Sequence, residues 1–431
     1  MSDDQFDAIV VGAGCAGAVA AYRLASAGCS VLVVERGNYA GAKNMTGGRI
    51  YTHSLARVFP DFEGSAPLQR RITHEKISMA APDALFTMDF TADELRESGK
   101  DSYAVLRGPF DQWLAERAEE AGADFIYGIA VEDLIVRDGR VCGVVAGGDE
   151  VEARITVLAD GANSLLAQKA GLADDVPLPC QMAVGVKETI ALPPSVIEDR
   201  FLCAPGEGAA WMFAGDCTKG RVGGGFLYTN DDSISLGLVA TLSDLAAGDV
   251  PIYQMLEDFK QRADIAPLVK GGELVEYSGH LVPEGGLAMV PRLYGDGVLV
   301  CGDAAMLCMN LGYSVRGMDF AVSSGDLAAD AVMRALEADD VSAAQLAAYE
   351  QLLDGCYVLQ DLKRFRRFPR YMEETTRIFN EYPAMARDIM LNLFKVDGHP
   401  QARIKNKLLG PLKRVGLWRV AQDGRKGMKA L

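Results

Sequence analysis

Apolar residues near the start of the chain form two short runs separated by a stretch of small residues. Residues 6–11 and 31–34 are mostly hydrophobic, and the second run ends in an acid, Glu35. The stretch between them extends to Gly28, a residue that commonly ends a helix. The pattern predicts a buried strand, a helix and a second strand, the arrangement of a parallel α/β sheet.

Comparable patterns recur along the rest of the chain. A helix is predicted to begin at Asp111, as its cap, and to be closed by Gly122, and a longer helix is expected over residues 318–337. Apolar or alternating runs predict strands at residues 124–127, 128–136, 141–146, 151–158, 182–190, 208–213, 222–228, 234–241 and 298–301.

The turn after the first strand carries three spaced glycines. Gly12 suits a tight turn, Gly14 lets the backbone approach a pyrophosphate, and Gly17 lets the helix pack closely on the strand. The helix start offers unpaired N–H groups to phosphates. Glu35 is placed to accept hydrogen bonds from ribose hydroxyls. The motif predicts a dinucleotide site but leaves open whether the ligand is FAD or NAD.

Two later segments favour FAD. The strand at 298–301 runs into Gly302-Asp303, where a carboxylate can bond a polyol hydroxyl such as those of a ribityl chain. The segment 312–317 then enters a helix, so its N–H groups can point at the pyrimidine edge of a flavin. Arg316 is a candidate for favouring an anionic reduced flavin, although a salt bridge at the helix start would explain it as well.

The combined motifs resemble a known family. Gly12-x-Gly14-x-x-Gly17 with Glu35-Arg36, Arg107, Asp160-Gly161 and Gly302-Asp303 is similar to the FAD-binding set of glutathione-reductase-type, hydroxylase-like flavoproteins. More narrowly, the chain resembles electron-transfer-flavoprotein:quinone oxidoreductases of the FixC type. The segments that carry this closer resemblance are residues 37–48, 223–228, 283–286 and 291–293.

The resemblance implies an α/β fold in which a Rossmann-like FAD-binding domain is built from discontinuous segments. Residues 1–75, 101–175 and 285–345 would form that domain. Residues 76–100 and 176–284 would form an inserted antiparallel-sheet domain that meets the substrate or acceptor. Residues 346–431 would form a helical C-terminal region with a basic tail.

The resemblance also implies which residues hold the cofactor. Gly47 and Gly48 are candidates for close approach to the flavin ring, and Arg36 and Arg107 for pyrophosphate or ribityl contacts. No catalytic side chain and no metal ligand is assigned. The implied FAD site consists of Gly12, Ala13, Gly14, Ala16, Gly17, Glu35, Arg36, Lys43, Asn44, Gly47, Gly48, Arg107, Val131, Asp160, Gly161, Gly302, Asp303, Gly312 and Tyr313.

The activity implied is electron transfer between a two-subunit electron-transfer flavoprotein and a quinone or ferredoxin-like acceptor. Mitochondrial-type relatives carry a cysteine-rich cluster domain, whereas the nine cysteines here include no C-x-x-C pair. We therefore expect a separate ferredoxin-like iron–sulfur protein to supply any cluster.

Charge and hydropathy limit the partners and the location. The net charge of −16 argues against nucleic acid. The acidic start of the chain does not suggest a signal peptide, and the charge-free apolar stretch 304–315 is too short to span a bilayer, so we expect a cytoplasmic protein. Residues 402–431 carry nine Lys or Arg against one Asp, with leucines and Trp418 interleaved. This tail suits the inner membrane face or an acidic protein, or else is a solvated helix.

Two other enzymatic functions remain open. A single-component prenyl-lipid reductase would carry a strand motif of which residues 209–214 keep Trp211 and Phe213 but lack the Tyr and Pro. Trp211 would then line a hydrophobic pocket, although core packing would explain it too. An aromatic hydroxylase would share the FAD motifs and take electrons from NAD(P)H. The segment 306–311 is expected in the core, with a quinone or lipid pocket as the alternative.

Overall fold

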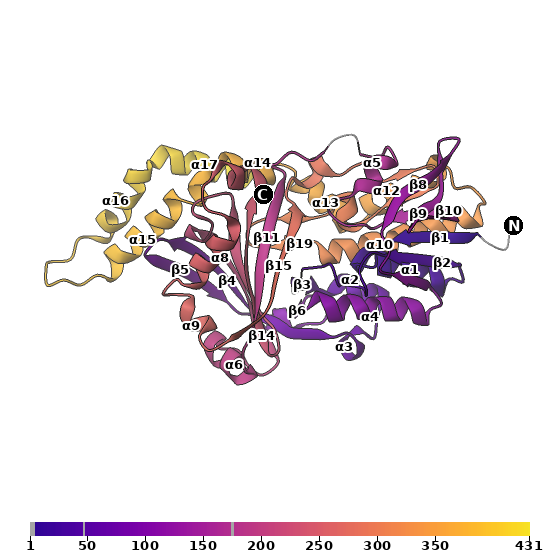
Figure 1. The fold of residues 1–431 in the computed structure, drawn as a ribbon. Coiled ribbons are helices and arrows are strands. Elements are labelled where there is room, and N and C mark those ends of the chain that lie inside the picture. Colours follow the sequence, from indigo (N-terminus) through magenta and orange to yellow (C-terminus); the bar gives the residue numbers. More distant parts are fainter. Residues whose placement is uncertain (1–4, 46–47, 174–175) are drawn as a thin grey trace.

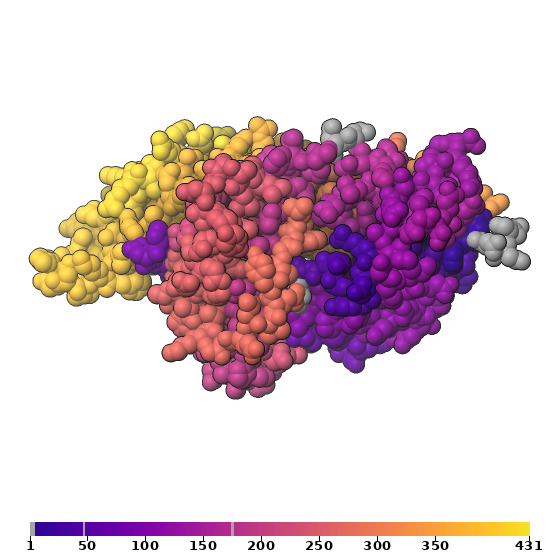
Figure 2. Space-filling model, viewed as in Figure 1, coloured from indigo at the N-terminus to yellow at the C-terminus, as the bar shows by residue number. Residues whose placement is uncertain are grey.

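The computed structural model describes residues 5–45, 48–173 and 176–431. Its two lobes each contain a large sheet, and the C-terminal helices extend the molecule beyond the second lobe (Figure 1). In the space-filling view these helices form a projection at the left end, on the side opposite the N-terminus (Figure 2).

The sheet of the first lobe is built around the N-terminal strand. Strand β1 (Phe6–Val11) lies between β10 (Asp149–Leu158) and β2 (Val31–Glu35), and all three run parallel. Val11 is in register with Leu158 on one side and Val34 on the other, so the loops after these strands open at one edge. The other strands of this sheet are β7 (Asp124–Tyr127), β8 (Val131–Arg137), β9 (Arg140–Ala146), β16 (Tyr294–Gly295) and β17 (Val298–Val300).

Small residues let the main helices of this lobe pack closely. A Cβ on Gly17 of α1 (Cys15–Ser26) would lie 1.9 Å from the carbonyl oxygen of Gly12. A Cβ on Gly325 of α10 (Met318–Glu337) would lie 2.2 Å from the carbonyl oxygen of Ala16. Helix α10 therefore fixes the position of the glycine turn through direct backbone contact with α1.

Other helices complete the first lobe and its apolar core. Helix α4 packs on α1, and α2 and α12 pack on α10. The bounds of these and their neighbours are α2 (Thr52–Val58), α3 (Phe62–Ser65), α4 (Arg107–Glu120), α5 (Leu165–Lys169), α11 (Ala343–Leu346), α12 (Ala348–Asp354) and α13 (Tyr357–Arg364).

The second lobe is a mostly antiparallel sheet. Its strand order is β15-β11-β14-β13-β12-β4-β6-β3, with β5 paired to β4, and the β12–β4 pair is parallel. The strands are β3 (Gly48–Tyr51), β4 (Leu68–Ala81), β5 (Ala84–Phe90), β6 (Ser102–Val105), β11 (Met182–Ala191), β12 (Glu207–Gly215), β13 (Gly223–Thr229), β14 (Ser233–Thr241) and β15 (Glu273–Pro283). A two-residue ladder, β18 (Met309–Asn310) with β19 (Val315–Arg316), follows.

Alternate residues of this sheet face different neighbours. Trp211, Phe213 and Leu227 form a second core, which contains Leu256 and Phe259 of a helix that packs on the sheet. That alternation follows from the period of an extended strand. The helices of this lobe are α6 (Pro194–Phe201), α7 (Leu242–Ala247), α8 (Ile252–Lys260) and α9 (Ala266–Val269).

The C-terminal helices run along the second lobe. Helix α15 (Glu381–Phe394) packs against β4 and β5, and α16 (Ile404–Val415) packs against α15. Helix α17 (Leu417–Ala430) returns to pack on α14 (Phe368–Glu374). The chain end is thereby brought back to the centre of the molecule (Figure 1).

The α/β fold class and the helix at 318–337 are confirmed. The predicted strands are present, with ends that differ by up to three residues, as in the strand expected to begin at 128 and found at Val131. The expected cap at Asp111 is wrong. Helix α4 begins at Arg107, and Asp111 lies inside it with its carboxylate bonded to the Arg107 guanidinium.

Candidate functional site

A cavity of about 880 Å³ lies between the two lobes. Its walls come from the turn after β1, the ends of β2 and β10, the start of α4, and the cavity-facing residues of the second sheet. Part of the C-terminal region also lines it, including Phe368, Tyr371 and Phe379. The volume is that of a small-molecule or cofactor site.

The glycine turn provides one end of the cavity. Gly12, Gly14 and Ala16 line it, and no side chain caps the start of α1 in the described structure, which leaves helix N–H groups for a ligand. Gly14 faces Arg107: a Cβ there would lie 3.8 Å from Nη2 of Arg107. This end therefore combines a helix N-terminus with a cation, the chemistry that holds a pyrophosphate.

Glu35 lines the same end and is fixed by two backbone groups. Its Oε2 accepts the N–H of Ala13 at 2.8 Å, and its Oε1 accepts the N–H of Gly37 at 2.6 Å. A carboxylate can accept further hydrogen bonds, so ribose hydroxyls can still reach it. The Ala13 contact ties the end of β2 to the glycine turn.

Arg107 is oriented by Asp111, which was expected from the sequence to cap the helix. Its Nε and Nη2 donate to Asp111 at 2.9 and 2.8 Å, and the amide of Asn44 also donates to that carboxylate. The Asp111 side chain is fully buried, so it serves to hold the two cavity-lining donors in place. The signal available in the sequence was the Arg–Asp spacing of four on one helix face.

Two carboxylates at strand ends are suited to ligand hydroxyls or amides. Burial raises the pKa of Asp160 to about 6, and its Oδ1 has no hydrogen-bond partner among the described residues. Burial also raises the pKa of Asp303, against the opposing charges of Arg107 and His280. A buried polar atom without a partner normally marks a place for a ligand or water. Together with the glycine turn, these groups fit the adenosine and ribityl parts of FAD.

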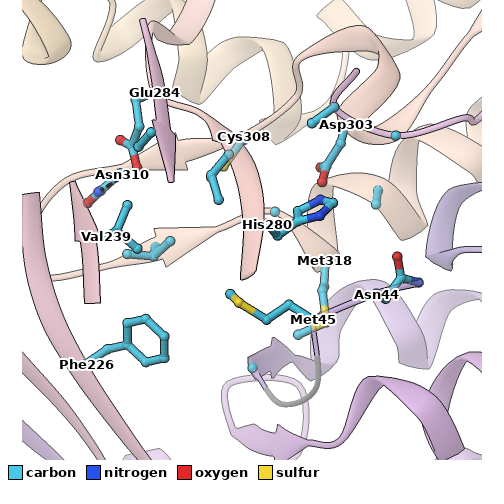
Figure 3. A pocket seen from close by; sticks show the side chains of 18 of the residues that line it. Asn44, Met45, Phe226, Val239, His280, Glu284, Asp303, Cys308, Asn310 and Met318 are labelled. Atoms are coloured by element: carbon cyan, nitrogen blue, oxygen red, sulfur yellow. Dashed lines mark hydrogen bonds between the residues drawn. The ribbon is translucent and has the colours of Figure 1, made fainter. Parts of the chain in front are cut away.

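The opposite part of the cavity lies near Gly48 and Gly312. A Cβ on Gly48 would lie 3.1 Å from Cε of Met318, so glycine keeps this wall open. Figure 3 shows Met318 below His280 and Asp303, with Glu284 and Asn310 on the other side of Cys308. Because glycine has no side chain, the backbone at this wall can closely approach a flat ring such as that of a flavin.

The structure brings most of the predicted residues to the cavity. The residues that line it are Gly12, Gly14, Ala16, Glu35, Arg36, Lys43, Asn44, Gly48, Arg107, Val131, Asp160, Gly161, Asp303 and Gly312. Ala13, Gly17 and Gly302 lie behind it and support the turns, and Tyr313 is half exposed. Gly47 lies outside the described residues.

Two residues singled out in the sequence do not line the cavity. Arg316 ion-pairs with Asp319 and, at 2.8 Å, with Asp361, so it forms the helix-start salt bridge that was the alternative to a flavin contact. Trp211 is buried in the second core, where its Nε1 donates to Ser78 at 2.7 Å. Its role here is packing.

The sequence reasoning missed a row of residues at the end of β15. His280, Val282 and Glu284 all line the cavity. Cys308 and Asn310 line it too, but they belong to the segment 306–311, for which a pocket was the alternative to the core. The signal for the β15 row was a spacing of two along an extended segment, which places alternate side chains on one face. Which face would meet the cofactor depends on the other lobe, so the spacing alone did not identify them.

Comparison with known proteins agrees with this geometry. Residues 368–431 match the model of the ETF-QO/FixC family C-terminal domain, and residues 7–94 match that of FAD dependent oxidoreductases. The chain is 51% identical to the probable electron transfer flavoprotein-quinone oxidoreductase YdiS and 50% identical to Protein FixC, both of Escherichia coli K12. Each comparison covers 100% of both chains.

Solved structures share the fold at low identity. A geranylgeranyl bacteriochlorophyll reductase-like protein from Thermoplasma acidophilum has a TM-score of 0.71 at 18% identity, over 98% of this chain and 99% of that one. The flavin-dependent brominase Bmp2 has a TM-score of 0.65 at 14% identity, over 96% and 100%. Full-length identity and the cofactor-shaped cavity lead to one conclusion: the chain is an FAD-dependent oxidoreductase of electron transfer and belongs to the ETF-QO/FixC family.

Proposed function

We propose that this protein takes electrons from a two-subunit electron-transfer flavoprotein and passes them through FAD to a quinone or a ferredoxin-like acceptor. The observation that carries the proposal is a group of apolar side chains that line the same cavity as the cofactor-end residues. These apolar lining residues are Met212, Phe226, Val239, Ile378 and Phe379. An apolar lining of this composition suits a quinone ring and the start of its isoprenoid tail. The name of the relative YdiS agrees with this assignment.

The chain's own residues would position the cofactor. Gly12, Gly14 and Arg107 would bind the pyrophosphate, and Glu35 would bind the adenosine ribose. Asp303 would accept a hydrogen bond from the ribityl chain, and the Gly312 turn would face the pyrimidine edge. When bound, FAD supplies two-electron redox chemistry, while the protein supplies orientation and electrostatics.

We further propose that the basic C-terminal tail contacts the acidic ferredoxin-like partner or an anionic membrane surface. Arg414 pairs with Asp388 and Lys426 with Glu374, and among the described residues no ion pair involves the other seven of the nine cations. Trp418 is 81% exposed and Ile404 is 67% exposed beside these charges. No helix in the described part of the chain is long and apolar enough to cross a membrane.

An anaerobic titration of the purified flavoprotein tests the donor. Reduced electron-transfer flavoprotein should bleach the flavin absorbance, whereas NADH and NADPH should leave it unchanged over the same time. Direct reduction by NAD(P)H would contradict the proposal and would favour a prenyl-lipid reductase or a hydroxylase. A protein that binds no FAD would contradict all three functions.

A further inference from the structure

Glu284 lies in the cavity wall directly after strand β15. It continues the row formed by His280 and Val282, and all three line the cavity. The backbone N–H of Glu284 donates to the carbonyl of Gln181 at 2.7 Å, which fixes the chain just beyond the end of the strand. The backbone that carries the carboxyl group is therefore held at the cavity wall by the end of β15 and by this hydrogen bond.

One carboxyl oxygen of Glu284 has a defined partner. Nδ2 of Asn310 donates to Oε1 of Glu284 at 3.2 Å, and Oδ1 of Asn310 accepts the N–H of Gly312 at 2.9 Å. Figure 3 shows the two side chains directed at each other. Because the Gly312 N–H occupies the amide oxygen, the amide nitrogen faces Glu284. The second oxygen, Oε2, is then available to carry a proton.

Four of the other titratable groups that line the cavity with Glu284 come from different segments of the chain. Cys308 precedes Asn310, His280 lies on β15, Glu373 lies on α14, and Cys180 precedes Gln181; all line the same cavity. Burial raises the pKa of the Cys308 thiol and lowers that of His280, so both are neutral near pH 7. Burial raises the pKa of Glu284 to about 7, and the Asn310 hydrogen bond opposes that rise. Glu284 can therefore exchange a proton under ordinary conditions.

A small second cavity adjoins Glu284 on the side of α13 and α14. Its volume is about 10 Å³, at the lower limit of the space that one water molecule needs. Glu284, Cys308 and Asn310 line both cavities, and Leu362, Phe365 and Pro369 close the small one from the C-terminal region. Glu284 thus lies between the large cavity and the small one beside α13 and α14.

We propose that Glu284 is the proton donor to quinone in this cavity, an inference that rests on the proposed function. Reduction of a quinone to a quinol takes two electrons and two protons. Bound FAD in its reduced, anionic form would supply both electrons and one proton. The second proton leaves the Glu284 carboxyl: its O–H bond breaks, an O–H bond forms on the quinone oxygen, and the resulting carboxylate is later reprotonated from solvent. Asn310 stabilises that carboxylate between turnovers.

The variant Glu284→Gln tests this role, with quinone and ferricyanide as alternative acceptors. Ferricyanide takes electrons without protons, so the ratio of quinone to ferricyanide turnover should fall by about 100-fold or more. Glu284→Asp retains an acid and should recover part of the ratio. Glu273→Gln, at the exposed start of the same strand, is the matched control and should keep the wild-type ratio. An unchanged ratio in Glu284→Gln would overturn the inference.

Two further readouts do not depend on turnover. The reduced-minus-oxidised infrared difference spectrum should contain a carboxylic acid band that Glu284→Gln loses and Glu273→Gln retains. The flavin midpoint potential should change its slope against pH near 7 in the wild type and not in Glu284→Gln. If the band and the change of slope survive in Glu284→Gln, the inference is wrong.

These outcomes separate the inference from the proposed function. A wild-type protein that reduces ferricyanide but no quinone would remove the quinone from the proposed function, and with it the donor role of Glu284. If wild type and Glu284→Gln had the same ratio of quinone to ferricyanide turnover, the proposed function would stand and the inference alone would be overturned.

Discussion

At the scale of single residues, the site depends on a few buried polar groups that hold others in position. Asp111 orients both Arg107 and Asn44, and Glu35 ties the glycine turn to β2. The glycines, Arg107, Asp160 and Asp303 were predictable because each type has a distinct role at a strand end. Asp111 was misassigned as a cap because a carboxylate near a helix start has two roles that local sequence does not distinguish.

Asp111→Asn should weaken both the fold and FAD binding. The substitution leaves the Arg107 guanidinium buried beside a neutral amide, and breaking a buried pair costs about 3–5 kcal/mol. Urea unfolding of the apoprotein and flavin fluorescence titration measure the two effects. Asp93→Asn, which removes an exposed partner of Arg96, is the control and should change neither. Equal effects of the two substitutions would contradict the role assigned to Asp111.

Glu284→Gln should also alter the dependence of stability on pH. Burial raises the pKa of Glu284 from 4.5 to about 7, so between these values the folded state keeps a proton that the unfolded state has lost. Wild-type stability therefore falls as pH rises through this window, by roughly 3 kcal/mol from this group. Glu284→Gln lacks that fall, so its stability relative to wild type should increase from about pH 4.5 to pH 7. Urea unfolding at several pH values measures the difference; a constant difference would contradict a raised pKa.

At the scale of elements, close packing of α1 and α10 sets the position of the glycine turn. Both helices were predictable from their patterns, since their spacing and helix-ending residues are local features. Their contact was not, because Gly325 and Ala16 are distant in sequence and nothing local marks Gly325 as a contact residue. The start of α4 was not predictable either, because α4 packs on α1 and its first residue, Arg107, bonds to Asp111.

Gly325→Ala should separate the two helices and destabilise the protein. The added Cβ would lie 2.2 Å from the carbonyl oxygen of Ala16, and overpacking of this kind costs about 1–3 kcal/mol. FAD binding should weaken as well, since α1 begins at the glycine turn. Gly424→Ala in α17 meets nothing within 4 Å and should stabilise by about 0.5–1 kcal/mol. Thermal unfolding and flavin content distinguish the two, and a stabilised Gly325→Ala would refute the packing argument.

The basic tail, residues 402–431, which contains α16 and α17, is best tested by charge rather than by deletion. Leu431 lines the cavity and Gly427 packs against Tyr371, so removing the tail would open the site. Replacing Arg403, Lys405 and Arg419 by Glu should weaken binding to an acidic ferredoxin or to anionic vesicles at least tenfold at low salt, with flavin content unchanged. Arg137→Glu, in the other lobe, is the control. Binding that is unaffected by the triple substitution would leave the tail as a solvated surface.

At the scale of the whole molecule, the site forms where two sheets and the C-terminal region meet. The resemblance anticipated the α/β class and the discontinuous cofactor motifs, because those motifs follow the parallel strands in order. It did not anticipate that Phe368, Tyr371 and Leu431 would line the cavity. Such closure depends on contacts between segments several hundred residues apart, and hydrophobic periodicity shows only that a helix has an apolar face. The division into domains remains a prediction.

The most direct test of electron relay is a double-mixing stopped-flow experiment on the FAD-loaded protein. Reduced electron-transfer flavoprotein is mixed first, and a short-chain quinone second, while flavin absorbance is followed. The account predicts that the flavin bleaches in the first phase and recovers in the second, at rates that support steady-state turnover. A flavin that stays oxidised with reduced electron-transfer flavoprotein, yet bleaches with NADPH, would contradict it.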